Sequence, residues 1–283
     1  MNASRTLRAG LHRGGMEIRH ILRSKREWFS HLSLPMIFLV FAGFTDHPVP
    51  GTTVPAAQLV IAGGLASLVS LTGITTLAQI LASEREDGTL LRMRGTPGGM
   101  LAYLLGKVCV VALVVGVGAA VLLVGGALFV GSSLPGSVQQ WATLLWVLGL
   151  GLVGASALGA AVGAVLPNPR EALAVVMIPL YGLVAISGVF FPTTVMPHVL
   201  QRTADVFPIK WMAQGVRSAI MPDDAAVAEA AGGWQHLATF GVLSAWCVLG
   251  LALAPRLLFR MARKESGSRL SDRRQRSTVA PVR

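Results

Sequence analysis

The residues of this chain that could do chemistry are concentrated in one charged stretch, residues 84–97, between two long apolar runs. The stretch contains carboxylates and guanidinium groups in equal number: Glu84, Arg85, Glu86, Asp87, Arg92 and Arg94. The whole chain is 53% hydrophobic and 13% charged, whereas ordinary globular proteins carry about 25% charged residues. Side chains of both signs at this density offer ionic contacts to another surface.

Motifs for catalysis, metal binding and nucleotide binding are absent from the sequence. The histidines are spread along the chain without an H-E-x-x-H or Cys/His cluster, and Cys109 and Cys247 fall inside apolar runs. The string "LLGKV" has the Gly-Lys of a phosphate-binding loop but lacks the leading Gly and the following Ser or Thr. We therefore expect no catalytic residue, no metal and no cofactor on this chain, so any ATP-driven work needs Mg-ATP on a separate subunit.

The apolar runs predict an all-α polytopic membrane protein. A bilayer core of roughly 30 Å takes about 20 helical residues to cross, and the mean hydropathy of the chain is +0.63. Six runs approach or exceed that length, at residues 28–44, 58–82, 104–130, 141–166, 172–190 and 234–258. They predict one transmembrane domain over residues 1–263, followed by a basic tail, residues 264–283, that we expect to be disordered.

The positive charges predict which way the chain faces. Of the 24 lysines and arginines, all but Arg202, Lys210 and Arg217 fall on one side of the predicted spans. Positive charge gathers on the cytoplasmic side of membrane proteins, so we expect a multi-pass cell-membrane protein with both termini in the cytoplasm. For the basic tail, topology and anionic lipid explain the charge better than nucleic acid does, and we expect no nucleic-acid partner.

The segment before the first span predicts an amphipathic helix. Leu7, Leu11, Ile18 and Leu22 share one helical face, and the remaining positions are largely basic or polar. Such a helix is typical of a segment lying in the headgroup plane.

Within the charged stretch, helix breakers alternate with apolar residues. Ser83 and Glu86 have the spacing of a helix cap, although the second span can equally continue for one more turn. Gly88 and Gly95 bracket a short helix with Leu90 and Met93 on one side. Thr96 and Pro97 then suit the start of the next helix. From the residues alone, a docking surface and a solvated loop are equally good interpretations.

The run "SEREDGTLLRMRGTP" closely resembles the E-R-E-x-G-T-L…T-P stretch of type-2 ATP-binding-cassette (ABC) permeases, a class that includes antibiotic and polysaccharide exporters. A second run, "SGVFFPTTVMPHVLQRTADVFPIKW" at residues 187–211, is similar to the exit of the fifth span in that family. The resemblance extends over nearly the whole chain, with the motifs in the family's order. Arg92 and Arg94 depart from it, because many members carry Glu and Leu or similar residues there.

The resemblance implies two partners and two sites. The partners are a cytoplasmic ABC ATPase subunit and a second permease copy, as a homodimer or a heterodimer. The residues expected to contact the ATPase are Glu84, Arg85, Glu86, Gly88, Thr89, Leu90, Met93, Gly95, Thr96 and Pro97. Re-entrant helices in the outer leaflet between the fifth and sixth spans are expected to form a gate, with Gly188, Phe190, Phe191, Pro192, Pro197 and Pro208.

A row of small residues in the fourth span predicts close helix packing. Gly159 and Gly163 form G-x-x-x-G, and Ala155 extends the row by one turn. Contact within the subunit is favoured over a dimer seam, since every polytopic bundle needs close contacts.

The uncharged centres of the spans favour an exporter permease over two alternatives. Ion-coupled secondary transporters usually keep ionisable residues near the midplane, and an intramembrane enzyme needs a nucleophile, base or metal there. An apolar interior suits an amphipathic or hydrophobic cargo such as an antibiotic, drug or lipid. Export of a polysaccharide or glycolipid is the alternative.

Overall fold

The computed structural model describes the backbone at residues 12, 14–16, 18–19, 23–45, 47–49, 51–86, 99–165 and 169–279, and the side chains of these residues except at 84–86, 99–101, 169–175 and 258–279. This part of the chain contains no strand, and one isolated antiparallel bridge joins Pro48 to Pro55. The prediction of an all-α membrane fold is confirmed.

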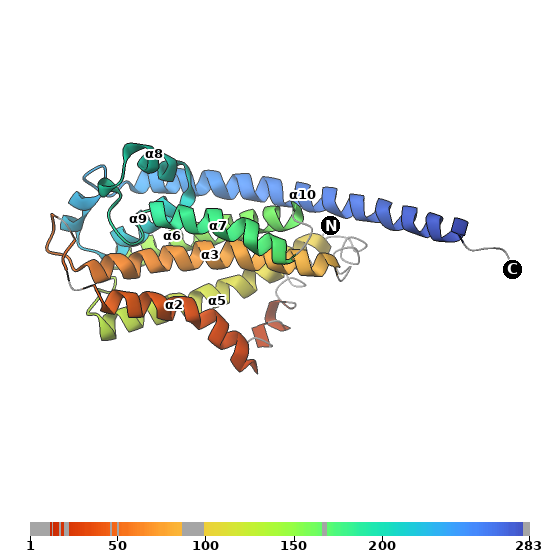
Figure 1. Cartoon of the computed structure of the whole chain (residues 1–283). Coiled ribbons are helices and arrows are strands. Elements are labelled where there is room, and N and C mark those ends of the chain that lie inside the picture. Colours follow the sequence, from red (N-terminus) through yellow and green to blue (C-terminus); the bar gives the residue numbers. More distant parts are fainter. Residues whose placement is uncertain are drawn as a thin grey trace.

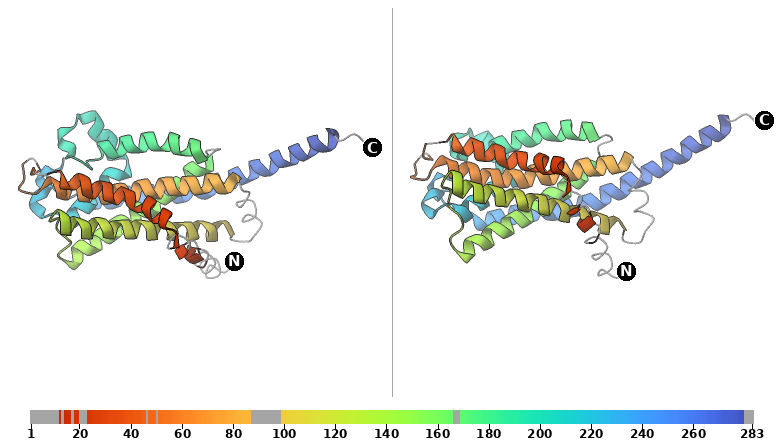
Figure 2. Two further views of the ribbon diagram at one scale, coloured as in Figure 1. Left: turned by 60° about the horizontal axis from the view of Figure 1, so that its bottom comes forward. Right: turned by 90° about the horizontal axis from the view of Figure 1, so that it is seen from below.

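Long helices lying side by side build the bundle (Figure 1). They are α2 (Lys25–Gly43), α3 (Ala56–Glu86), α5 (Gly99–Phe129), α6 (Val138–Val165), α7 (Pro169–Ile186) and α10 (His236–Val279). Between α7 and α10 lie two short α-helices, α8 (His198–Val206) and α9 (Pro208–Ile220), and two 3-10 turns, η1 (Thr193–Val195) and η2 (Asp223–Ala228). These short elements gather at the end of the bundle opposite to the projecting part of α10 (Figures 1 and 2).

Four described helices are long and apolar enough to cross a membrane, namely Ala56–Ser83, Ala102–Phe129, Val138–Val165 and His236–Leu257. The other two predicted spans also form helices, whose apolar parts within the described residues are Glu27–Gly43 and Val176–Ile186. With 19 residues in α2 and 18 in α7, each is roughly 27 Å long. That length nearly equals a hydrocarbon core of about 30 Å.

Two helix ends differ from the sequence-based expectation. Helix α7 ends at Ile186, so the last residues of the predicted fifth span form a turn. Helix α10 continues to Val279, where we predicted a disordered tail from residue 264. The segment after Pro255 contains no further proline until residue 281, and its many arginines favour helix.

Helix α3 lies at the centre of the bundle, in contact with α2, α5, α6, α7 and α9. Its apolar window is 78% buried, against 28% for that of α10. The predicted N-terminal helix is helical at its described residues, and a Cβ added at Gly14 would lie 3.0 Å from the Gly106 carbonyl oxygen of α5. This segment therefore rests on α5.

The row of small residues on α6 faces α3 within the subunit. A Cβ added at Gly159 would lie 2.4 Å from the Ile74 carbonyl oxygen, and one at Gly163 would lie 2.7 Å from that of Ala78. One turn earlier, the Ala155 methyl lies 2.7 Å from where a Cβ at Gly73 would stand. These are backbone contacts that only small residues allow.

We expect Gly159→Ala to destabilise the protein, because the new methyl meets α3 backbone that no side-chain rotation can move. Overpacking of this kind costs about 1–3 kcal/mol. The matched control is Gly149→Ala on the same helix, where a Cβ meets nothing within 4 Å and helix propensity favours Ala by about 1 kcal/mol. Thermal unfolding of the purified variants measures both. Equal melting temperatures for the two variants would contradict the close packing of α6 against α3.

Candidate gate at one end of the bundle

The segment between α7 and α10 is built from short elements that prolines begin. Pro192, Pro197 and Pro222 each stand immediately before a helical element, and Pro208 is the first residue of α9. Proline suits these positions because its fixed φ begins a helix and its missing N–H would lack a helical partner there. The short elements of this segment therefore start where its prolines stand.

Gly188 makes the turn that follows α7. Its φ is +72°, and a Cβ there would lie 2.8 Å from the Thr193 methyl carbon. Both facts require glycine, since other residues pay for a left-handed backbone and no space remains for a side chain. One residue earlier, the Ser187 hydroxyl donates to the Leu183 carbonyl at 2.5 Å and closes the last turn of α7.

The residues after Gly188 fasten the turn to α2 and α3. The Phe190 ring stacks on Phe38 at 5.8 Å between centroids and meets Phe41 edge-on at 5.5 Å. The Val189 backbone lies directly against α3, because a Cβ added at Gly63 would come within 2.2 Å of the Val189 carbonyl oxygen. Phe191 is instead 43% exposed. Of the two phenylalanines predicted in the gate, Phe190 is the anchor.

Helix α9 is enclosed by protein. Every residue from Ile209 to Ile220 is buried, and α3, α6, α8 and α10 all contact the helix. Its sequence is nevertheless amphipathic, with Lys210, Gln214 and Arg217 spaced four and three apart so that they share one face. Polar groups on an enclosed helix need partners inside the protein.

Arg217 finds its partners in two other segments. Its Nε donates to Glu229 Oε1 at 2.5 Å, and its Nη1 donates to the Gly188 carbonyl at 2.9 Å. The Arg217 side chain is 2% exposed and that of Glu229 is 7% exposed. One guanidinium group thus joins α9 to the turn after α7 and to the residue that follows η2.

A second ion pair closes the corner between α8 and α9. Lys210 Nζ pairs with Asp205 Oδ1 and lies 4.5 Å from the centre of the Trp211 ring. The Trp211 indole N–H donates to the Asp205 carbonyl at 2.7 Å. Because 46% of the Asp205 side chain is exposed, water reaches the carboxylate of this pair. The two residues are five apart in the sequence, so the pair joins only neighbouring segments.

The analysis of the sequence missed both ion pairs. It placed Lys210 and Arg217 only as charges on the poorly charged side of the membrane. A usable signal was the arginine within the string "GVRSAI", because a charge inside an apolar helical pattern has to face a partner.

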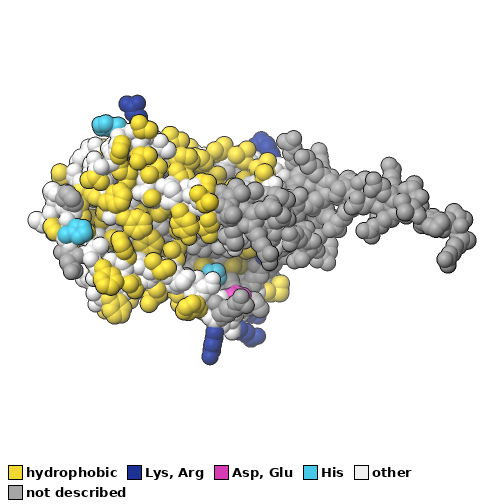
Figure 3. Space-filling model, in the orientation of Figure 1, with side chains coloured by type: hydrophobic (Ala, Val, Ile, Leu, Met, Phe, Trp, Pro, Cys, Tyr) yellow, Lys and Arg dark blue, Asp and Glu magenta, His cyan; other side chains and the backbone are white. Residues whose placement is uncertain are grey.

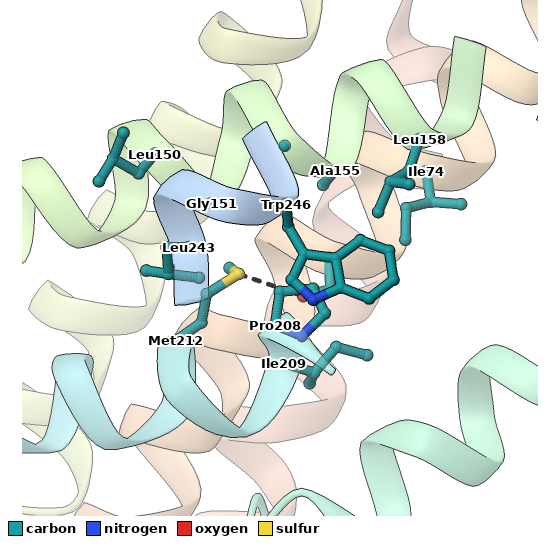
Figure 4. A pocket seen from close by; sticks show the side chains of 12 residues that line it. Ile74, Leu150, Gly151, Ala155, Leu158, Pro208, Ile209, Met212, Leu243 and Trp246 are labelled. Carbon is teal, nitrogen blue, oxygen red and sulfur yellow. Dashed lines mark hydrogen bonds between the residues drawn. The ribbon is translucent and has the colours of Figure 1, made fainter. Parts of the chain in front are cut away.

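A small apolar cavity lies between the start of α9 and helices α3, α6 and α10 (Figure 4). Met212 and Pro208 line it from α9, and Trp246 lines it from α10. The Ser70 hydroxyl donates to Met212 Sδ at 3.6 Å, and the Trp246 indole N–H donates to the Val206 carbonyl at 2.9 Å. The first contact holds α9 against α3, and the second holds the end of α8 against α10. Within the described residues no cluster of His, Cys, Asp or Glu could hold a metal ion.

The structure describes only the first part of the predicted ATPase-contact stretch. Residues 84–86 are the last residues of α3, and Ser83 donates to the Ile80 carbonyl at 3.0 Å. The second span therefore continues for one more turn instead of ending at a cap. Gly88, Thr89, Leu90, Met93, Gly95, Thr96 and Pro97 lie outside the described residues.

The outer surface of the bundle is apolar. Hydrophobic side chains cover much of the face shown in Figure 3. Phe29 and Phe44 of the α2 region, Phe129 of α5, Ile178 of α7 and Leu237 of α10 are all more than 75% exposed. A surface of this kind is stable against lipid.

Comparison with protein families agrees with this architecture. The family model described as "ABC-2 family transporter protein" matches residues 28–255. The chain belongs to the ABC-2 family of transporter proteins. The match begins within α2 and ends within α10, so it includes the gate segment and all the long helices. Comparison with curated proteins finds no match.

Residues 187–190 are here called the gate turn. In this ABC-2 protein we expect Phe190→Ala to loosen the gate turn, because the turn loses ring contacts to both Phe38 and Phe41. Each aromatic pair contributes about 0.5–1.5 kcal/mol beyond its buried area, so the stability loss should reach about 2 kcal/mol. The neighbouring Phe191→Ala should cost less than half as much. Thermal unfolding in detergent measures the difference, and a larger loss for Phe191→Ala would contradict the anchoring role.

Proposed function

We propose that this chain is the membrane-spanning permease subunit of an ATP-driven exporter. The match to the ABC-2 family over residues 28–255 carries the proposal. The sequence contains no phosphate-binding loop, so a separate ABC ATPase subunit supplies the energy. Two permease copies with two ATPase subunits form the working complex.

The ATPase contact is proposed for residues 84–97, which link α3 to α5. Because α3 touches α2, α5, α6, α7 and α9, a push on its end reaches every part of the bundle that it contacts. Glu84 and Glu86 supply ionic contacts, and Leu90 and Met93 fill an apolar groove on the ATPase. The position of this link at the end of α3, the most buried of the four long apolar helices, supports the assignment.

The proposed cargo is an amphipathic or hydrophobic compound of antibiotic, drug or lipid type. The predicted spans carry no Asp, Glu, Lys or Arg near their centres, and Lys107 lies in the second turn of the apolar span Ala102–Phe129. A route through such helices offers apolar contact and little to a highly charged polymer. Transport of radiolabelled amphipathic compounds by proteoliposomes that contain both subunits tests this proposal.

We expect Leu90→Asp to abolish co-purification of the ATPase and substrate-stimulated ATP hydrolysis, while membrane insertion persists. Truncating a buried apolar anchor at an interface often costs about 2 kcal/mol or more, and a buried carboxylate costs more. Glu84→Lys combined with Glu86→Lys should act in the same way by reversing the ionic contacts.

The matched control is Leu134→Asp, which places the same charge on a half-exposed leucine at the other end of the bundle. This variant should retain the ATPase. Normal ATPase recovery and normal transport in the variants at residues 84, 86 and 90 would refute the docking assignment.

We also expect the end of the bundle that carries α8 and α9 to face the cell exterior. Single cysteines at Thr53 and Gly136, both exposed at that end, should react with an impermeant thiol reagent added outside intact cells. The background lacks Cys109 and Cys247, which are the chain's two cysteines. Reaction only after permeabilisation would reverse the proposed orientation.

A further inference from the structure

We propose that residues 222–235, here called the strap, form a lid over the polar face of α9, and that the Arg217–Glu229 ion pair is the latch that holds it closed. The strap contains η2 and leads into α10. It lies at the end of the bundle opposite to the projecting part of α10 (Figure 2). This inference rests on the exporter function proposed above, because it assigns the opening of the strap to the export cycle.

One strong polar contact and two weak ones attach the strap to the rest of the protein, as far as the described residues show. The strong contact is the 2.5 Å bond from Arg217 to Glu229. The Thr194 hydroxyl donates to the Ala228 carbonyl at 3.5 Å, and the Gln214 amide donates to the Gly233 carbonyl at 3.5 Å. Both weak contacts lie at the limit of a hydrogen bond, whereas a charge-assisted bond is about twice as strong as a neutral one.

Apolar contacts attach the strap near both of its ends, because Ala225 belongs to the main core and the partly buried Trp234 packs against that core. Between these two contacts the strap offers mainly small or exposed side chains. Ala225 and Ala226 are buried, and Ala228 packs against Val49, Ala56 and Leu59. Alanine has one methyl group to bury, so these contacts remove little apolar area from water. The larger Val227 is 68% exposed. Within the strap, the Trp234 indole N–H donates to Asp223 at 3.2 Å and joins its two ends, so the strap can move as one unit.

Buried polar atoms without partners lie next to the contacts that hold the strap. The Gln214 amide donates to Gly233, and Thr193 directly precedes Thr194, whose hydroxyl donates to Ala228. Gln214 Oε1 and Thr193 Oγ1 are buried and accept no hydrogen bond from any described residue. A buried polar atom without a partner loses the hydrogen bond that water would have given it. Lifting the strap hydrates these atoms, or offers them to a donor group on the cargo. The closed state is therefore opposed from within, and the latch is the strongest polar contact that holds it.

The latch is also coupled to the gate turn through a hydrogen bond from Arg217. Arg217 donates to the Gly188 carbonyl as well as to Glu229, and the Gly188 turn is anchored on α2 and α3 through Phe190 and Val189. A displacement of that turn removes one of the two acceptors that hold the guanidinium in place. Movement of the gate during export thereby weakens the hold on the strap.

The Lys210–Asp205 pair supplies a matched control at the same end of the molecule. It also involves a cation of α9, but its partners are five residues apart and do not reach the strap. Removing the Asp205 carboxylate should therefore leave the strap closed, whereas removing that of Glu229 should release it.

A cysteine at Thr193 reports whether the strap is open. Thr193 is 2% exposed and its hydroxyl has no partner among the described residues, so Thr193→Cys changes the closed state little. In the full chain with Cys109→Ala and Cys247→Ala, an impermeant maleimide added outside ATP-depleted cells should label this cysteine slowly. Adding Glu229→Gln should raise the labelling rate at least tenfold, and adding Asp205→Asn should leave it within twofold.

A second reporter separates opening of the strap from misfolding. Gly136→Cys is exposed on the connection between α5 and α6, so it should label at the same rate in the parent, the Glu229→Gln and the Asp205→Asn backgrounds. If Gly136→Cys labels normally while Glu229→Gln leaves Thr193→Cys at the parent rate, the latch is refuted. An equal increase with Asp205→Asn also refutes it. Because the cells contain no ATP, these rates report the latch alone, whereas absence of ATP-dependent export by the parent would refute the proposed function.

Discussion

A segment that leaves the helical form at membrane depth must find partners for its backbone and its charges inside the protein. In the segment between α7 and α10, α9 finds such partners by enclosure, whereas α8 is largely exposed. Helix α9 lies between α3, α6 and α10 with all residues from Ile209 to Ile220 buried. Arg217 then satisfies the carbonyl of Gly188, at the point where the backbone turns left-handed, and pairs with Glu229. The irregular segment can exist there because one buried arginine serves two segments at once.

Helix α3 connects this enclosed segment to the other end of the bundle. Near its start, Ala56 and Leu59 touch Ala228 of the strap, and Gly63 lies against Val189 of the gate turn. Further along, its backbone meets the glycines of α6, and it runs on to Glu86. At 31 residues, α3 is roughly 46 Å long. Since the contacts at Gly63, Gly159 and Gly163 bring backbones together, α3 is tightly packed against the gate turn and against α6.

The sequence predicted the features that depend on local pattern. Uninterrupted apolar runs of span length indicated the long helices, and the family resemblance at residues 187–211 indicated helices between the fifth and sixth predicted spans. The small-residue row on α6 indicated a close helix contact, although its partner, α3, could not be read from spacing because many helices offer a matching groove. The continuation of α10 to Val279 was missed because charge and low hydropathy were taken as signs of disorder, while arginine-rich composition also favours helix.

The ion pairs could not be predicted from the sequence, for a different reason. Arg217 and Glu229 are 12 residues apart and stand on different elements, and nothing in the intervening residues states that the chain folds back. Likewise, an amphipathic helix such as α9 predicts one face in water or headgroups, whereas here the other parts of the chain cover both faces. Other parts of the same chain therefore take the place of the water or headgroups that the amphipathic pattern of α9 predicts.

Enclosure also explains how a strong contact can be switched. Removing one partner of a buried ion pair costs about 3–5 kcal/mol, whereas exposed pairs contribute about 0–1 kcal/mol. The Arg217–Glu229 pair owes its strength to the exclusion of water, and the strap that excludes the water is the element that the pair holds down. A small lift admits water, raises the local dielectric and weakens the attraction, which favours a further lift. The contact between α9 and the strap is therefore cooperative, with a closed dry state and an open wet state, and a displacement of Gly188 is enough to favour one over the other.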